Sequence, residues 1–382
     1  MRECEAMAIL LAAIPLDYTR REAALRRAGS ARSLLEQPRA YDRWLTPRGV
    51  GALERAMLER ESILDEILDA GVHLIARGEE GYPERLAQIP RAPHLLYVQG
   101  KAFIGDALKI AVVGTRDASE YGLSHTRSIT KELAGAGACI VSGLALGIDA
   151  AAHRGALMAG GRTIAVLGSA LDRFYPPENL GLRDEILASG GSIVSEYPMG
   201  MPHTTGSFLQ RNRIIAGLCA GTLVTEGPHR SGALRTAYNA ADYGREVFAL
   251  PGSVDAVGSQ LPHRLIGEGA HLIACAADIL QVLAPQLAGE ILAHKREKTR
   301  AQEKPAPRAD AGAHRAPAAA VPDDLPEESR AVLAALSGGE MEFDALSDAA
   351  GIDATSLGAL LMELEMDGLI DALPGLRYAR RA

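Results

Sequence analysis

Short apolar runs alternate with longer amphipathic stretches through the middle of the chain. Six runs have the length of buried strands, and they span residues 110–114, 139–143, 163–168, 192–196, 222–226 and 246–251. Between them lie stretches of about 12 to 18 residues with helical patterns of apolar positions. Continuous β-branched runs separated by helices predict a parallel sheet covered on both faces, and right-handed crossovers make such a sheet doubly wound. We therefore expect an α/β, mostly parallel, Rossmann-like body.

The segments before this body have other patterns. Residues 1–75 have apolar positions spaced three and four apart, for example at 63–68, and predict a small helical domain. The turn at residues 49–51, Gly-Val-Gly, is interpreted as structural, with a phosphate-binding helix-hairpin-helix as the alternative. Prolines and turn residues then lead to a strand-like run at 94–98, which predicts an edge strand added to the body. The body accordingly spans residues 76–284.

The last quarter of the chain is different again. Residues 285–322 contain five prolines among Ala, Lys, Arg and Glu, a composition that predicts a flexible linker. Residues 323–382 show three short helical patterns followed by a hairpin, which is typical of a winged helix. The helical patterns cover 327–336, 342–350 and 353–367.

The net charge of −8 is unevenly distributed. Residues 323–382 carry 13 acidic and 4 basic residues, and residues 285–322 carry 7 basic and 4 acidic ones. The other 284 residues sum to only −2, so a local basic pocket on the body is compatible with the acidic total. In the terminal domain, the helix at 353–367 has no basic residue, and we expect this domain not to bind DNA by itself.

Composition also restricts the compartment. No apolar run approaches the roughly 18 to 20 residues of a membrane span, and Glu3 and Glu5 stand where a signal peptide would be basic. We expect a cytoplasmic protein. The four scattered cysteines have no CxxC spacing, so buried reduced thiols are expected rather than disulfides or a zinc site. They are Cys4, Cys139, Cys219 and Cys275.

Candidate chemistry gathers where the predicted strands end. In doubly wound folds ligands bind at the carboxyl ends of the strands, and glycines or small hydroxyls at the following turns leave amide groups that attract phosphate. One later segment adds charge and an aromatic ring. Phe208 lies one helical turn before Arg211, and Arg213 follows, so we expect a basic helix face with a surface for base stacking. A core phenylalanine with two ion-paired surface arginines is the alternative.

Signatures of nucleotide enzymes are missing. There is no GxxxxGK[ST], and Gly143 and Gly147 are spaced unlike a GxGxxG motif. Asp149 and His153 share a helix face, with Glu226 and Asp172 at other strand ends, so a metal or acid–base site is conceivable. A helix cap with a hydrogen-bonded histidine is the favoured interpretation. We expect no catalytic machinery, no cofactor and no metal.

Taken together and in order, the motifs resemble one family. They are Gly81-Tyr82-Pro83, Val113 to Arg116, Ser142 to Asp149, Ser195 to Pro198, Arg211 to Leu218 and Ser231-Gly232. The chain resembles the DNA-processing protein A (DprA/Smf) family of bacteria. The resemblance implies a SAM-like amino-terminal domain and a non-enzymatic protein of natural transformation. Such a protein protects incoming single-stranded DNA, helps load a RecA-type recombinase, and works as a homodimer through its Rossmann-like domain.

The resemblance also implies a DNA pocket that grips phosphates and stacks a base. Its residues, with the intervening Asn212, would be Arg116, Gly143, Ala145, Ser207, Phe208, Arg211, Asn212 and Arg213. One departure concerns Thr205, where some members have a basic residue, and His203 is the candidate substitute. Two other functions remain open. One is a nucleotide-processing enzyme of the lysine-decarboxylase-like Rossmann group, for which the acid downstream of Ser231-Gly232 is missing; the other is an interaction scaffold.

Overall fold

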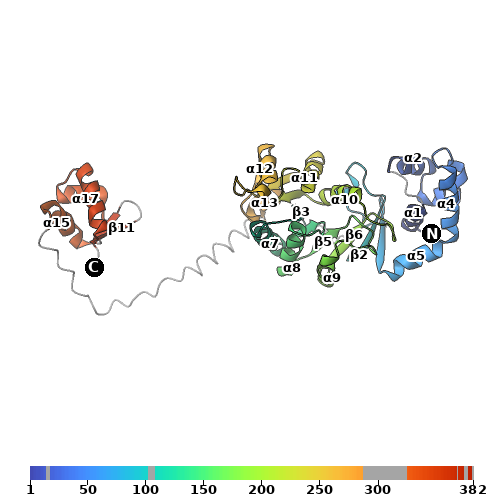
Figure 1. The fold of residues 1–382 in the computed structure, drawn as a ribbon, viewed down its shortest axis with the longest axis horizontal. Helices are drawn as coiled ribbons and strands as arrows, with labels where there is room; N and C mark the ends of the chain where they lie inside the picture. The colour runs from blue at the N-terminus through green and yellow to red at the C-terminus, as the bar shows by residue number, and fades with distance from the viewer. Residues whose placement is uncertain (14–17, 102–107, 287–324, 368, 374–376, 381–382) are drawn as a thin grey trace. The chain divides into compact units, whose positions relative to one another are not determined.

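A computed structural model describes residues 1–13, 18–101, 108–286, 325–367, 369–373 and 377–380. The chain divides into two compact units, Met1–Gln302 and Glu303–Ala382, which are considered separately (Figure 1). The predicted linker at 285–322 lies outside the described residues from residue 287 onward.

The first unit is built on one sheet. In its described part the sheet has nine strands in the order β1-β2-β6-β5-β4-β3-β7-β8-β9. All neighbours from β6 to β9 are parallel, and the predicted doubly wound sheet is confirmed. The strands are β1 Val72–Ala76, β2 Leu95–Gly100, β3 Lys109–Val113, β4 Cys139–Ser142, β5 Thr163–Val166, β6 Ser192–Ser195, β7 Gly221–Val224, β8 Glu246–Ala249 and β9 His271–Leu272.

The segment before the body adds two antiparallel strands rather than a single edge strand. β2 pairs with β6 on one side and with β1 on the other, so the edge of the sheet is β1. The prediction that the run at 94–98 forms the edge strand is therefore wrong, because this run forms β2, which lies inside the sheet. Its backbone is paired on both sides, which agrees with the full burial of Leu96 to Val98.

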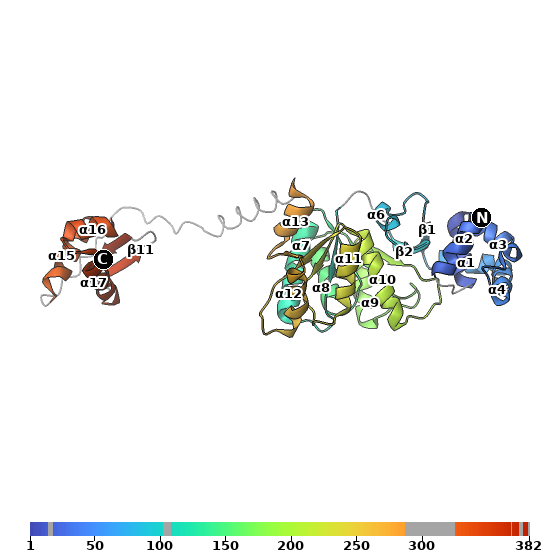
Figure 2. The ribbon, with the colours of Figure 1, turned by 90° about the horizontal axis from the view of Figure 1, so that it is seen from above.

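Helices cover both faces of the sheet (Figures 1 and 2). α10, α11 and α12 pack on one face with the short α6, and α7, α8, α9 and α13 lie on the other. Each face has its own apolar cluster, which explains why the strands are continuously apolar. The helices are α6 Glu84–Ala87, α7 Glu120–Gly135, α8 Ile148–Met158, α9 Leu180–Ala188, α10 Thr205–Leu218, α11 Gly232–Asp242, α12 Gln260–Gly267 and α13 Ala276–Leu283, with 3-10 turns at Pro177–Asn179 and Val257–Ser259.

The amino-terminal helices are fused to the sheet. Their apolar side chains form one cluster with those of β1, β2 and β6, including Tyr97 of β2 and Ile193 of β6. The predicted domain boundary at residue 75 falls inside β1. The elements are α1 Glu3–Ala13, α2 Tyr18–Ala28, α3 Ala31–Glu36, the 3-10 turn η1 Pro38–Tyr41, α4 Pro47–Leu58 and α5 Arg60–Asp69.

The expected turn at Gly49-Val50-Gly51 is wrong. These residues lie in the first turns of α4, and so they do not form the hairpin of a helix-hairpin-helix. The helix begins earlier because the Thr46 side chain accepts a hydrogen bond from the Gly49 amide at 3.1 Å and Pro47 occupies the first helical position.

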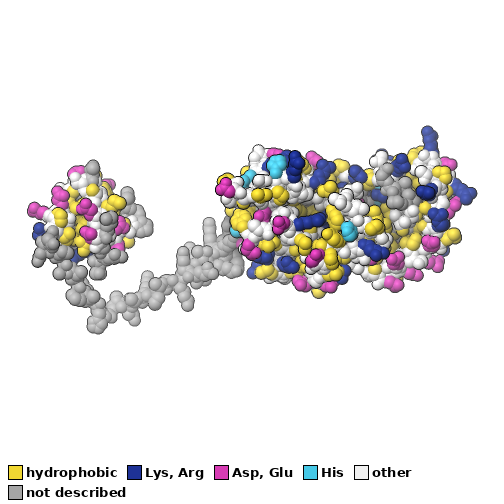
Figure 3. Space-filling view, in the orientation of Figure 1, with side chains coloured by type: hydrophobic (Ala, Val, Ile, Leu, Met, Phe, Trp, Pro, Cys, Tyr) yellow, Lys and Arg dark blue, Asp and Glu magenta, His cyan; other side chains and the backbone are white. Residues whose placement is uncertain are grey.

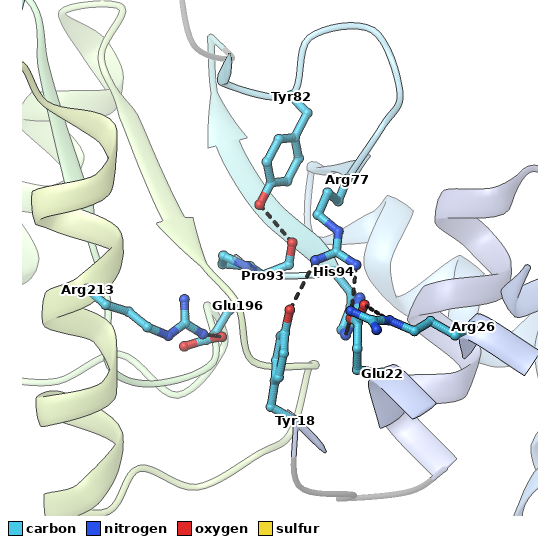
Figure 4. Close-up of polar contacts among 9 residues, drawn as sticks. All are labelled: Tyr18, Glu22, Arg26, Arg77, Tyr82, Pro93, His94, Glu196 and Arg213. Atoms are coloured by element: carbon cyan, nitrogen blue, oxygen red, sulfur yellow. Dashed lines mark hydrogen bonds and ion pairs between the residues drawn. The ribbon is translucent and has the colours of Figure 1, made fainter. Parts of the chain in front are cut away.

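A polar cluster joins α2 to the segment between β1 and β2 (Figure 4). Arg77 donates to the Tyr18 hydroxyl and to Glu22, both at 3.0 Å. His94 is 4% exposed and its ring stacks on Tyr18 with centroids 5.0 Å apart. Its Nε2 lies 3.3 Å from Glu22 Oε2. Burial, helped by Arg21 and Arg77, lowers the pKa of His94 from 6.5 to about 3.

This cluster makes stability depend on pH. Because the pKa of His94 falls on folding, the unfolded chain binds the proton more tightly, and the native state loses stability as pH drops below 6.5 toward 3. Between pH 7.5 and pH 5.0 we expect this one group to cost about 2 kcal/mol. Urea titrations of the native protein and of His94→Gln at both pH values measure the difference. Equal losses in the two proteins would contradict the assignment to His94.

In its described residues, 325–367, 369–373 and 377–380, the second unit has three α-helices and a small sheet of order β10-β12-β11. Its core includes Leu346, Leu357 and Leu361. On α17, the third helix, Glu363 and Glu365 are exposed. The elements are α15 Glu327–Ala335, β10 Met341–Glu342, α16 Phe343–Ala350, α17 Ala354–Met366, β11 Ile370–Leu373 and β12 Arg377–Arg380, with a 3-10 turn at Leu336–Gly338. Every helix in the described part of the chain is too short or too polar to cross a membrane.

Candidate nucleic-acid groove

A groove of about 410 Å³ opens at the carboxyl edge of the sheet. It lies where the strand order reverses, since β3 leads to β4 on one side and is flanked by β7 on the other. Its walls are the turns after β3, β4 and β7, one side of α10, and the start of α11. The lining residues include Thr115, Arg116, Asp117, Ala145, Phe208, Leu209, Arg211, Asn212, Ser231 and Gly232.

The start of α10 is fixed by hydrogen bonds. Thr204 and Ser207 form a capping box, in which each side chain accepts from the backbone amide of the other at 3.1 and 3.0 Å. The Ser207 hydroxyl also donates to the Gly168 carbonyl at 2.5 Å. Ser207 is 5% exposed. The structure therefore places this predicted DNA contact beneath the groove, where it holds α10 in position.

Phe208 stands at the rim of the groove beside Arg116. The guanidinium carbon of Arg116 is 5.5 Å from the centre of the Phe208 ring, within the range of a cation–π contact. Arg116 is exposed and Phe208 is half-buried. The ring also packs on Gly168, where an added Cβ atom would come within 2.6 Å of it. The predicted pairing of one aromatic ring with one guanidinium at this edge is present.

Two more rings extend this rim. His203 and Tyr175 each lie 5.6 Å from Phe208 by ring centroids, and 4.6 Å from one another. His203 is exposed and stands two residues before Thr205, the position that departs from the family pattern. The sequence reasoning missed Tyr175, although the run Phe174-Tyr175-Pro176 in the loop beyond β5 was an available signal.

Arg211 is buried and faces inward. It is 5% exposed, donates from Nη1 to the Gly143 carbonyl at 2.7 Å, and makes a second bond from the same atom to the Val166 carbonyl. Burial lowers the pKa of Arg211, and the nearby Asp149 opposes that shift. A Cβ atom on Gly143 would fall within 2.3 Å of the guanidinium, so any side chain at this position would displace Arg211 from its carbonyl partners. Arg211 thus ties the turn after β4 to the end of β5.

The amides of the turn after β4 are already bonded. Gly143 and Ala145 donate their N–H groups to Asp149 Oδ2 at 3.1 and 3.5 Å. The expectation that this turn offers bare amides to phosphate is therefore wrong at these two positions. The reason is the short distance along the chain, because Asp149 lies in the first turn of the helix that follows. Ala145 itself remains half-exposed and lines the groove.

Arg213 does not share a face with Arg211. Arg213 forms a close ion pair with Glu196 on the flank of α10 that faces the Tyr18–His94 cluster (Figure 4). The expected single basic face is wrong, because residues two apart on a helix point about 200° away from each other. The observed contact of Arg213 is the ion pair that the sequence analysis gave as the alternative to a basic DNA-binding face. Asn212 does line the groove, and its amide donates to the Gly232 carbonyl at 3.2 Å.

The residues of the conceivable metal or acid–base site do not converge. His153 bonds Thr163 Oγ1 at 2.7 Å rather than Asp149. Glu226 accepts from the Ser119 amide at 2.9 Å and supports the start of α7. Asp172 accepts from the Gly200 amide at 3.0 Å. Within the residues that the structure describes, no cluster of His, Cys, Asp and Glu has the make-up of a metal site.

Comparisons with known proteins agree with one another. Residues 73–284 match the family described as DNA recombination-mediator protein A, and residues 316–375 match the DprA winged helix domain. Protein Smf of Synechocystis sp. is 37% identical over 342 residues, covering 86% of this chain and 85% of that protein.

Two solved structures are also similar. DNA processing protein A from Streptococcus pneumoniae has a TM-score of 0.63 and 34% identity, and the match covers 74% of this chain and 98% of that one. DNA processing protein A from Helicobacter pylori, described for its single-stranded DNA binding mode, has a TM-score of 0.50 and 32% identity. That match covers 56% of this chain and 97% of the other.

Proposed function

This chain belongs to the DNA recombination-mediator protein A (DprA/Smf) family, and from that premise we propose that it binds single-stranded DNA without catalysing a reaction on it. The observation that carries the proposal is the pair formed by Arg116 and Phe208 at the open rim of the groove. A guanidinium neutralises a phosphate, and a flat ring stacks a base of any identity, so the pair suits an unpaired strand.

The geometry supports a binder more than an enzyme. Glu226, the acid nearest in sequence to the Ser231-Gly232 turn, bonds the start of α7. A nucleotide-processing enzyme of the lysine-decarboxylase-like group would need such an acid directed at its substrate. No specific observation favours that second function.

The finer role follows the family resemblance. We propose that the protein acts in natural transformation, where it protects incoming DNA, helps load a RecA-type recombinase, and works as a homodimer through the Rossmann-like body. Sedimentation of the protein in solution gives its mass and so tests whether it is a homodimer. Recombinase loading on DNA coated by a single-strand-binding protein tests the loading role.

The binding mode has a direct test. We expect the full chain to shift oligo-dT in an electrophoretic assay, to bind duplex of the same length more weakly, and to lose affinity as salt rises. The reason is that a base in a duplex is stacked on its neighbours and cannot reach Phe208. Equal affinity for both forms of DNA, or affinity independent of salt, would contradict the proposal. Release of free base from nucleotides would show an enzyme instead.

A further inference from the structure

The amino-terminal helices separate their charges. Residues 18–48 contain eight arginines and three acidic residues, a net charge of +5, whereas residues 49–70 contain two arginines and six acidic residues, a net of −4. Basic side chains stand out over these helices in Figure 3. The basic segment, residues 18–48, therefore carries more positive charge than its own carboxylates neutralise.

One arginine of the basic segment covers the single tryptophan of the chain. Arg27, in the last turn of α2, holds its guanidinium 5.9 Å from the ring centre of Trp44. Arg27 is exposed and Trp44 is half-buried, with part of its ring packed on the apolar core. An arginine and an aromatic ring together at the surface are the two groups that hold an unpaired strand.

Two further arginines lie close to this pair in the chain. Arg43 and Arg48 are exposed, and neither has an ion pair with a described residue. Arg48 lies in the first turn of α4, which contains no acidic residue, although the helix dipole there favours an anion over a cation. A bound anion would interact favourably both with the Arg48 guanidinium and with the amino terminus of α4. Neighbouring exposed arginines are instead ion-paired: Arg26 with Glu22, Arg32 with Glu36, and Arg39 with Glu54.

We call Arg27, Arg43, Trp44 and Arg48 the Arg–Trp surface. It belongs to the same compact unit as the groove, and the first residue of α2, Tyr18, lies beside the flank of α10 that carries Arg213, a residue that does not line the groove (Figure 4). At 1.5 Å per residue, α2 advances about 14 Å between Tyr18 and Arg27. A strand leaving the groove would have to pass the Arg213 flank of α10 before it covers that distance along α2.

We propose that the Arg–Trp surface binds the continuation of the single strand held in the groove, by its phosphates and by a base against Trp44. The proposal rests on the proposed function, because it requires a strand in the groove. It adds a second contact on the amino-terminal helices and predicts that binding strengthens with the length of the strand.

Oligomers of two lengths test it with the full chain. Oligo-dT of about 6 nucleotides fills the groove alone, and oligo-dT of about 24 nucleotides can reach both contacts. In the variant R27Q/R43Q/R48Q we expect unchanged affinity for the short oligomer and about tenfold weaker affinity for the long one. The slope of log affinity against log salt should fall by about 2 for the long oligomer, because each phosphate contact contributes about 0.7.

The variant R2Q/R60Q/R154Q is the matched control, since it removes three other exposed arginines. It should bind both oligomers as the native protein does. Emission from Trp44, the sole tryptophan, should change with the long oligomer and not with the short one. If the triple variant of the Arg–Trp surface keeps native affinity and salt slope for the long oligomer, this inference is wrong and the proposed function is unaffected. If the native protein binds neither oligomer, the proposed function fails with it.

Discussion

Replacing Phe208 by leucine should weaken binding of short oligo-dT about tenfold to a hundredfold while the protein stays folded. Stacking of one base on an aromatic side chain contributes about 1 to 3 kcal/mol, and leucine has no flat ring. Leucine still fills the space against Gly168, on which the Phe208 ring packs. Fluorescence anisotropy of a labelled oligomer measures the affinity, and thermal melting measures the fold.

Two companion variants make this result specific. Phe208→Tyr keeps a flat ring and should restore most of the affinity. Met158→Ala removes an exposed apolar side chain at the last residue of α8, which is not among the residues that line the groove, and should have no effect. Native affinity in Phe208→Leu would remove the base-stacking role from the proposed function. An equal loss in Phe208→Tyr would point to a steric effect instead.

Replacing Arg211 by methionine should destabilise the fold by about 3 to 5 kcal/mol, because a buried charged group with two carbonyl acceptors is lost. The Gly143 and Val166 carbonyls lose their donor, and Asp149 loses the nearby positive charge that opposes the upward shift of its pKa on burial. DNA affinity should fall as well, since the turn after β4 is no longer held. Urea denaturation followed by circular dichroism gives the free energy of unfolding.

Arg211→Lys separates positioning from direct contact with DNA. Lysine keeps the positive charge but lacks the planar fork, and it should recover little stability. If Arg211 acted mainly as a phosphate ligand, lysine would recover DNA affinity, and methionine would leave the free energy of unfolding unchanged. The additional variant Arg211→Met/Asp149→Asn removes both charges and should be less destabilised than Arg211→Met alone.

Much of the fold was predictable because parallel strands covered on both faces are apolar throughout. The runs at 139–143 and 192–196 differ from β4 and β6 by one residue at most. The edge position of 94–98 was mistaken for a physical reason. A short strand preceded by prolines and followed by a glycine has the same pattern whether one or both of its edges are paired, and only its pairing with β1 and β6 decides between the two.

The candidate groove was predictable in place but not in the direction of its side chains. The sequence prediction, which took Phe208 from the helix segment and Arg116 from the family resemblance, put both in one pocket, and they do lie together at one rim. It did not show that Arg211 turns inward, because the buried carbonyls of Gly143 and Val166 that attract it are far away in the sequence. For Arg213 the error was avoidable, since helical geometry alone separates residues i and i+2.

The apolar cluster shared by the amino-terminal helices and β2 has a consequence for how this protein can vary. Deleting residues 1–71 would uncover Leu95 and Tyr97, which are now almost fully buried. Removing the first helices from this chain would therefore expose part of the core of the sheet, unlike removal of a tethered module.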